Sequence, residues 1–171
     1  MLLEEFKHSV LPIKNKLYRF ALRLLRNEDE AKDVAQEVLI KAWNRRDDLQ
    51  NLGSIEAWCM RLTRNMSLNR LKSGHYDKTD ELTDTQNLYV VGHNPYQSTE
   101  QRDTMNNVKL FVEALPDLQQ QVIQLRDVEG YTYEEISKAL DVNLGQVKVN
   151  LFRARQNIRR KLQSIDAYGI S

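Results

Sequence analysis

The 171-residue sequence contains few of the residues that favour folds other than helical ones. Six glycines, three prolines and 8% aromatic residues argue against a β-sandwich or a β-barrel. A single cysteine, Cys59, excludes an intramolecular disulfide and agrees with a reducing cytoplasm. No apolar stretch is long enough to span a bilayer, and Glu4, Glu5 and Lys7 interrupt any apolar region of a secretory signal. We therefore expect a helical, cytoplasmic protein that does not insert into membranes.

Motifs for catalysis and metal binding are also missing. His8, His75 and His93 lie far apart and lack metal-ligand spacing, and Cys59 has no histidine nearby. The sequence contains no phosphate-binding glycine motif, no nucleophile elbow and no cluster of carboxylates suited to a nucleic-acid enzyme. We expect a protein that is not an enzyme and that holds neither a metal nor another cofactor.

The net charge of +1 is uninformative, but its distribution along the chain is not. Residues 73–103 contain six acidic side chains against two basic ones. Residues 142–165 contain no acidic side chain and six basic ones: Lys148, Arg153, Arg155, Arg159, Arg160 and Lys161. Such asymmetry predicts segments with different partners, and the basic one suits nucleic acid.

Helical periodicity dominates residues 1–73, the predicted first domain. Between residues 28 and 46, apolar residues recur at alternating spacings of three and one, which indicates an amphipathic helix. Ser54 is a suitable N-cap for a later helix, which ends before Ser73 and Gly74. The helices are expected at about 2–9, 13–25, 28–46 and 54–72.

A second domain, residues 104–171, follows a flexible acidic linker at 74–103 that lacks sustained periodicity. Thr132 with Glu135 three residues later forms a capping box for a short helix. The helices are expected at about 104–114, 117–130, 133–140 and 144–164. The sequence thus predicts an all-α fold of two small helical domains, unfixed relative to each other because the linker is flexible.

Residues 131–161 carry the strongest functional signal, a short capped helix, a turn and a longer basic helix that begins after Asn143. This is a helix-turn-helix pattern. One stripe of the longer helix is expected to pack inward: Leu144, Val147, Leu151, Ala154, Ile158 and Leu162. The other sides present side chains suited to base edges and phosphates in a major groove: Gln146, Lys148, Val149, Phe152, Arg153, Arg155, Gln156, Arg159 and Arg160. The alternative is a solvated cationic face.

Two further helix faces are candidate interfaces. On the helix over 54–72, cations and amides lie opposite the expected core residues Ile55, Trp58, Cys59, Leu62 and Met66. They could bind a single strand, although a plain surface is an alternative: Arg61, Arg64, Asn65, Asn69 and Lys72. On the helix over 28–46, an isoleucine within a polar face suggests protein contact, although one exposed apolar residue is ordinary: Asp33, Gln36, Glu37, Ile40 and Asn44.

These segments, in this order, resemble the extracytoplasmic-function (ECF) group of the sigma-70 family of RNA polymerase subunits. The first domain resembles sigma region 2 and the second resembles region 4. The matching segments are residues 33–43, 58–71, 115–116, 121–123, 130–136 and 145–155. Asn143 stands where the family usually has a small residue, and Lys148 and Val149 stand where Arg and Ser are frequent. The promoter sequence that the family reads therefore cannot be transferred to this chain.

The resemblance implies contacts with core RNA polymerase. Asp33, Gln36 and Glu37 would dock on the clamp helices of the β′ subunit. The linker would thread a channel of the polymerase. The β subunit of the polymerase is a further expected partner. An anti-sigma factor would bind exposed surfaces of both domains.

The resemblance also implies two contacts with promoter DNA. The loop at 47–53 would capture the melted −10 strand together with Arg61, Asn65 and Asn69. The second domain would enter the major groove of the −35 element through Lys148, Val149, Phe152 and Arg153.

The competing interpretation is a helix-turn-helix transcription regulator that acts on duplex DNA without being a polymerase subunit. Its C-terminal domain would have the same pattern. The region 2-like pair of helices argues against it, as does the lack of a phosphoacceptor arrangement or a ligand-pocket signature.

Overall fold

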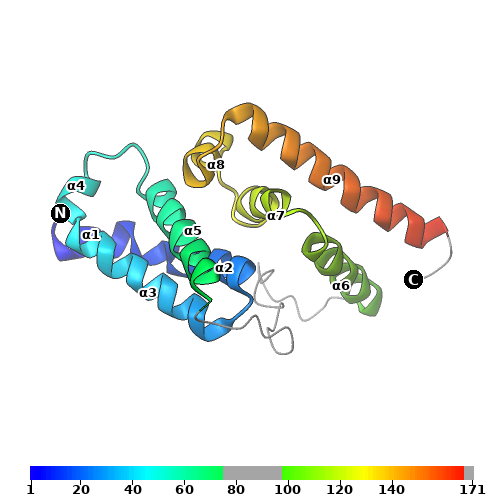
Figure 1. The fold of residues 1–171 in the computed structure, drawn as a ribbon, viewed down its shortest axis with the longest axis horizontal. Coiled ribbons are helices and arrows are strands. Elements are labelled where there is room, and N and C mark those ends of the chain that lie inside the picture. The colour runs from blue at the N-terminus through cyan, green and yellow to red at the C-terminus, as the bar shows by residue number, and fades with distance from the viewer. Residues whose placement is uncertain (75–97, 168–171) are drawn as a thin grey trace.

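The computed structural model describes residues 1–74 and 98–167, and these residues form helices joined by short turns (Figure 1). The predicted all-α fold is confirmed. The N-terminal half, residues 1–74, contains α1 (Leu3–Ser9), η1 (Leu11–Ile13), α2 (Lys14–Leu25), α3 (Glu28–Asn44), α4 (Arg46–Leu49) and α5 (Ile55–Ser73). The C-terminal half, residues 98–167, contains α6 (Thr99–Glu113), α7 (Asp117–Ile123), η3 (Gln124–Val128), α8 (Tyr133–Leu140) and α9 (Leu144–Ala167). Most of the predicted linker lies outside the described residues.

The core of the N-terminal half lies where α2, α3 and α5 pack against one another. Leu17, Phe20, Val34, Val38 and Met60 are each buried to 99% or more. The N-cap predicted at Ser54 is present, since its side chain accepts a hydrogen bond from the first turn of α5, and Asn27 caps α3 in the same way. These caps fix where each helix begins and therefore which residues face outward.

In the C-terminal half, α9 packs its apolar stripe against α6, α7 and α8. Val147, Leu151 and Ala154 are buried as predicted, but Leu144 is 40% exposed because it occupies the first position of the helix, beyond the packed surface. The predicted capping box of Thr132 and Glu135 is present at the start of α8. A helix-turn-helix is thus formed by α8 and α9.

Two boundaries differ from the sequence prediction. Helix α6 begins at Thr99, five residues before the expected start, because Ser98 and Gln101 form a capping box there. Residues 117–130 do not form one regular α-helix, since α7 passes into the π-helical turn η3. π-Helical turns alter which way the following side chains point, and this one lies between the two halves.

The predicted core face of α5 is only partly buried. Cys59 is fully buried, while Ile55, Trp58, Leu62 and Met66 are half-buried and pack against the core. The buried residues of α5 are Ala57, Cys59, Met60, Thr63 and Ser67, so small and polar side chains are among them. The reason is that α5 packs against α2 and α3 on one side and against α8 on another, so no single apolar stripe marks its interior.

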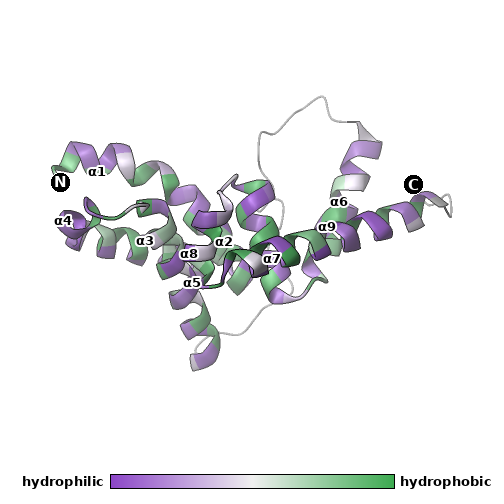
Figure 2. Ribbon diagram, turned by 90° about the horizontal axis from the view of Figure 1, so that it is seen from above, coloured by the Kyte–Doolittle hydropathy of each residue, from purple (hydrophilic) through white to green (hydrophobic). Residues whose placement is uncertain are grey.

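The two halves pack against each other, contrary to the expectation that their relative position is unfixed. Helix α8 lies on α5, and α7 lies beside α2, in both views of the chain (Figures 1 and 2). Buried residues of both halves form one continuous cluster. The sequence did not predict this contact, because its partners are distant in the chain, such as Arg19 and Glu129, which are 110 residues apart.

Adjacent residues of α9 test the assignment of its inward and outward sides. Leu151 is 2% exposed and Phe152 is 66% exposed. We predict that Leu151→Ala lowers the free energy of unfolding by about 2–5 kcal/mol, because it leaves a cavity. Phe152→Ala should change it by less than about 0.5 kcal/mol. Urea unfolding monitored by circular dichroism measures both values, and equal losses would show that the helix is rotated relative to our description.

Candidate polymerase and promoter interfaces

The solvent-facing side of α9 gathers the residues predicted to meet a major groove. All nine are exposed, and two of them are apolar, Val149 at 44% and Phe152 at 66%. Figure 2 shows the C-terminal half of α9 as mostly hydrophilic. The predicted N-cap Asn143 accepts a hydrogen bond from the backbone of Gln146 at 2.8 Å, which fixes the start of the helix. A long, basic helix with two exposed apolar side chains suits base edges and thymine methyl groups.

Two of the nine side chains already have partners within the C-terminal half. Gln146 Oε1 accepts a hydrogen bond from the backbone N–H of Asn143 at 3.1 Å, so this amide caps the helix. Arg155 donates to both carboxylate oxygens of Asp127, at 3.0 Å and 2.5 Å, and this hydrogen bonding raises the pKa of Arg155. Arg155 therefore joins α9 to η3. The other cations of the predicted set remain available to DNA: Lys148, Arg153, Arg159 and Arg160.

A cleft of about 340 Å³ lies beside the exposed ring of Phe152. It is formed where α8 meets α9, and its walls combine rings, alkyl chains and cationic groups. It is lined by Tyr133, Lys148, Leu151, Phe152, Arg155, Gln156 and Arg159. Four of the predicted DNA-facing residues besides Phe152 therefore surround one concavity on the outer side of the helix-turn-helix.

The outward face of α3 holds the five residues predicted to contact polymerase, and all five are exposed. Ile40, 60% exposed, lies between polar neighbours. One member has a partner: Arg70 of α5 forms ion pairs with Glu30 and, at 3.4 Å, with Glu37. Glu37 is therefore positioned from α5, while Asp33 and Ile40 protrude on the same face of the helix.

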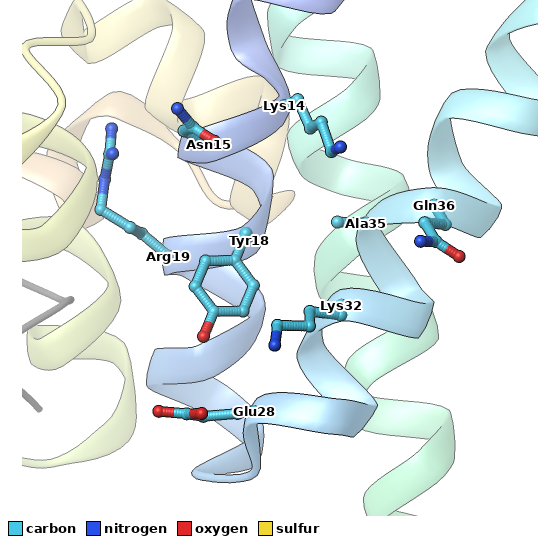
Figure 3. A pocket seen from close by; sticks show the side chains of 8 residues that line it. All are labelled: Lys14, Asn15, Tyr18, Arg19, Glu28, Lys32, Ala35 and Gln36. Atoms are coloured by element: carbon cyan, nitrogen blue, oxygen red, sulfur yellow. The ribbon is translucent and has the colours of Figure 1, made fainter. Parts of the chain in front are cut away.

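A groove of about 580 Å³ runs between α2 and α3 beside this face (Figure 3). Lys32 of α3 extends toward Tyr18 of α2, and Gln36 lies at the edge of the groove. The remaining lining residues are Lys14, Asn15, Arg19, Glu28 and Ala35. The predicted polymerase-binding residue Gln36 thus borders a groove whose lining includes three cations, Lys14, Arg19 and Lys32.

The face of α5 that was predicted to hold a single strand is only partly open. Asn65, Asn69 and Lys72 are exposed. Arg61 is also exposed, but its Nη2 atom lies 3.5 Å from the Asp141 carboxylate, and Arg64 Nε donates to Gln121 at 3.2 Å. The structure therefore brings these residues together on one helix, yet pairs two of its cations with the C-terminal half.

Sequence reasoning missed a stripe of cations on α2. Spacings of three and four residues place Lys16, Arg19 and Arg23 on one face of that helix, and this face turns toward the C-terminal half. Arg26 follows as the C-cap residue in the left-handed conformation and donates to the Glu113 carbonyl at 3.5 Å. Its spacing was visible in the sequence, but only the packing of the two halves reveals which surface the stripe meets.

Comparison with known proteins adds to this geometry. The family model for sigma-70 region 2 matches residues 11–75, and the model for sigma-70 region 4 matches residues 106–158. Together the two matches cover more than half of the chain. The chain belongs to the sigma-70 family of RNA polymerase sigma factors.

Curated relatives and solved structures agree with the ECF group of this family. The chain is 26% identical over 160 residues to the ECF RNA polymerase sigma factor SigW of Bacillus subtilis. The aligned stretch covers 89% of this chain and 86% of that protein. Its fold matches the sigma factor RpoE of Bartonella quintana, solved with the anti-sigma factor NepR, at a TM-score of 0.70 and 23% identity, covering 94% and 98% of the two chains. It also matches CnrH, solved with the cytosolic domain of CnrY, at a TM-score of 0.66 and 18% identity, covering 95% and 90%.

The chain is therefore an ECF sigma factor, a polymerase subunit that directs promoter-specific initiation of transcription and is not an enzyme. The competing interpretation, a helix-turn-helix regulator independent of polymerase, is excluded by the match to region 2. Among the helices of residues 1–74 and 98–167, none has the length and apolar character needed to cross a bilayer.

The Arg155–Asp127 pair gives a prediction about α9. Because the two side chains are 45% and 37% exposed, the coupling energy in a double-mutant cycle of Arg155→Ala and Asp127→Ala should be about 0.3–1 kcal/mol, smaller in high salt. The matched cycle of Arg159→Ala with Asp127→Ala should give no coupling. Thermal unfolding of the single and double variants measures both, and zero coupling for Arg155 would return it to the DNA-facing set.

Proposed function

We propose that this sigma factor uses three separate helix faces for its three contacts. The outward face of α3 binds the polymerase clamp, the exposed face of α5 binds the melted −10 strand, and α9 enters the −35 major groove. The observation that supports this assignment is that each predicted set lies on one helix, with every α3 and α9 member and all of the α5 set except Arg64 exposed. In the same proposal residues 1–73 act as region 2, residues 104–171 act as region 4, and residues 74–103 connect them.

Regulation by an anti-sigma factor belongs to the same proposal. Support comes from the two structural relatives, RpoE and CnrH, which were solved with NepR and with the cytosolic domain of CnrY. A protein partner of this kind would need exposed surfaces on both halves, and the faces of α3 and α9 offer them. Because its work is done on polymerase at chromosomal promoters, we place the protein in the cytoplasm.

The contact with core polymerase is tested on α3. The double variant Asp33→Ala with Ile40→Ala should weaken binding to core polymerase at least about tenfold, because central interface residues contribute most of the binding energy. Its unfolding temperature should stay unchanged, since both side chains are exposed. Glu4→Ala removes another exposed carboxylate, from α1, and serves as the control. Unchanged affinity of the double variant in a fluorescence titration would remove this face from the interface.

On α9, base reading and phosphate binding are separable. Arg153→Ala should cost about 1–3 kcal/mol and relax the preference at one −35 position, as expected when a bidentate base contact is lost. Arg159→Ala should weaken binding on all sequences alike and flatten the salt dependence by about one unit of slope.

The measurement for this pair is promoter binding by the reconstituted holoenzyme against all single-base changes of the −35 element, at two salt concentrations. A uniform loss for Arg153→Ala would make Arg153 a phosphate contact and would require a different rotation of α9 in the groove.

A further inference from the structure

The outward side of α9 carries an apolar residue that the fold of the C-terminal half does not require. Helix α9 lies at the outside of this half, with α6 and α7 on one side of it (Figure 1). Val149 precedes Ile158 of the inward stripe by nine residues, which places the two side chains on opposite sides of the helix. Val149 is 44% exposed and lies outside the hydrophobic core. Its neighbours on the outward side are mostly polar or cationic: Gln146, Arg153, Gln156 and Arg160.

A valine at this position does not serve the stability of the helix. β-Branched side chains lose rotamer freedom in a helix and form helices less readily than Arg, Lys or Gln. Phe152, one turn further on, is 66% exposed and likewise contributes little to the core. Residues that break such local rules are found mainly at functional sites. We therefore attribute Val149 and Phe152 to a partner of α9 rather than to its fold.

The charges around the two apolar side chains indicate what kind of partner fits. The cleft beside Phe152 is lined by Lys148 and Arg159, and residues 142–165 contain no acidic side chain. An apolar protein surface would bury these cations without partners, which is costly. The phosphates that border a major groove would pair with them. An apolar centre with cations beside it therefore fits duplex DNA.

Within a major groove, Val149 can discriminate between bases in one way. Its side chain has no hydrogen-bond donor or acceptor, and the apolar group on the base edges is the C5 methyl of thymine. Val149 and Phe152 are three residues apart, which is about 4.5 Å along the helix axis. Successive bases of one strand are about 3.4 Å apart. The two side chains therefore suit methyl groups on neighbouring base pairs.

We propose that Val149 is a specificity-determining residue that contacts the C5 methyl group of one pyrimidine in the −35 element, while Phe152 contacts a methyl group on the neighbouring base pair. The proposal rests on the −35 role that we propose for α9, and it adds the chemical group that is recognised. Thymine and 5-methylcytosine carry this methyl group at the same place in the groove, whereas uracil and cytosine lack it. The Ser that is frequent in the family at this position would offer a hydroxyl group instead.

Removing single methyl groups from the DNA tests the contact. The reconstituted holoenzyme first selects a promoter from a library with a randomised −35 element. Each −35 thymine of that promoter is then replaced in turn by deoxyuridine, which removes only the methyl group. We expect the affinity of the wild type to fall about fourfold at the position that Val149 contacts, the factor that corresponds to one buried methyl group. A selected element without thymine would contradict the proposal.

Variants of α9 connect each methyl group to a side chain. Val149→Ala should bind the thymine and deoxyuridine promoters equally at one position and keep its sensitivity at the neighbouring one. Phe152→Ala should show the reverse. Arg159→Ala is the control, because loss of a phosphate contact should weaken binding to both promoters and leave their ratio unchanged. Val149→Ala should fold normally, since alanine forms helices more readily than valine.

A second pair of bases separates contact with the methyl group from the shape of an A·T base pair. Cytosine and 5-methylcytosine differ by the same methyl group within a G·C pair. At the position that Val149 contacts, 5-methylcytosine should be bound about fourfold more tightly than cytosine by the wild type. Val149→Ala should bind the two equally.

The outcomes distinguish this proposal from the −35 role of α9. Equal sensitivity to deoxyuridine in the wild type and in Val149→Ala would overturn the proposal, since the methyl group would then act through the shape of the DNA. Sensitivity at no position would also overturn it. If Arg159→Ala still weakened binding in that case, only the methyl contact would fail. If Arg159→Ala had no effect either, the −35 role of α9 would fail with it.

Discussion

A carboxylate that is almost completely buried needs a cationic partner, and Glu129 has one in Arg19 of the other half of the chain. The partner and the carboxylate are 110 residues apart in sequence. This ion pair joins α2 to the residue that follows η3, and α8 covers one side of α5 in the same arrangement. The exposed remainder of α5, the outward face of α3 and the solvent side of α9 are what the closed chain leaves for other molecules.

The same chemistry serves within the protein and toward DNA. Arginines on α2 and α5 donate hydrogen bonds to carboxylate and amide oxygens of the C-terminal half, and phosphates offer oxygens of the same kind. Cationic surfaces of a sigma factor that suit the oxygens of DNA therefore also suit the carboxylate and amide oxygens of its own second half. Arg155 shows this on a smaller scale, because its guanidinium is occupied by Asp127 although it lies on the recognition helix.

Local signals in the sequence predicted much of the fold. Capping residues at Ser54 and Thr132 marked the starts of two helices, and the spacing of α9 predicted the burial of Val147, Leu151 and Ala154, although Ile158 and Leu162 are half-buried and Leu144 is exposed. The resemblance to sigma regions 2 and 4 rested on residues that the family models also match. These features are local because each depends on residues within a few turns of one another.

Features that depend on distant partners were not predictable in the same way. The interior of α5 includes Thr63 and Ser67 because helices cover it on two sides, and no apolar stripe records that. The π-helical turn η3 interrupts a segment whose apolar spacing predicts a regular helix. The Gln146 side chain caps α9 instead of facing outward freely, although its position in the helical pattern is the predicted one. The cations of α2 were visible, but their meaning depends on Glu129 and Gln124, which lie in the other half.

The distance between the two halves tests this account most directly. Dyes on His8→Cys in α1 and Gln163→Cys in α9 can be attached selectively, because burial raises the pKa of Cys59 to about 12 and keeps that thiol unreactive. Single-molecule energy transfer should then give one well-defined distance for the free chain at low salt. Bound to core polymerase, the same chain should give a different single distance. A broad distribution in the free chain, or the same distance in both states, would contradict closure by Arg19 and Glu129.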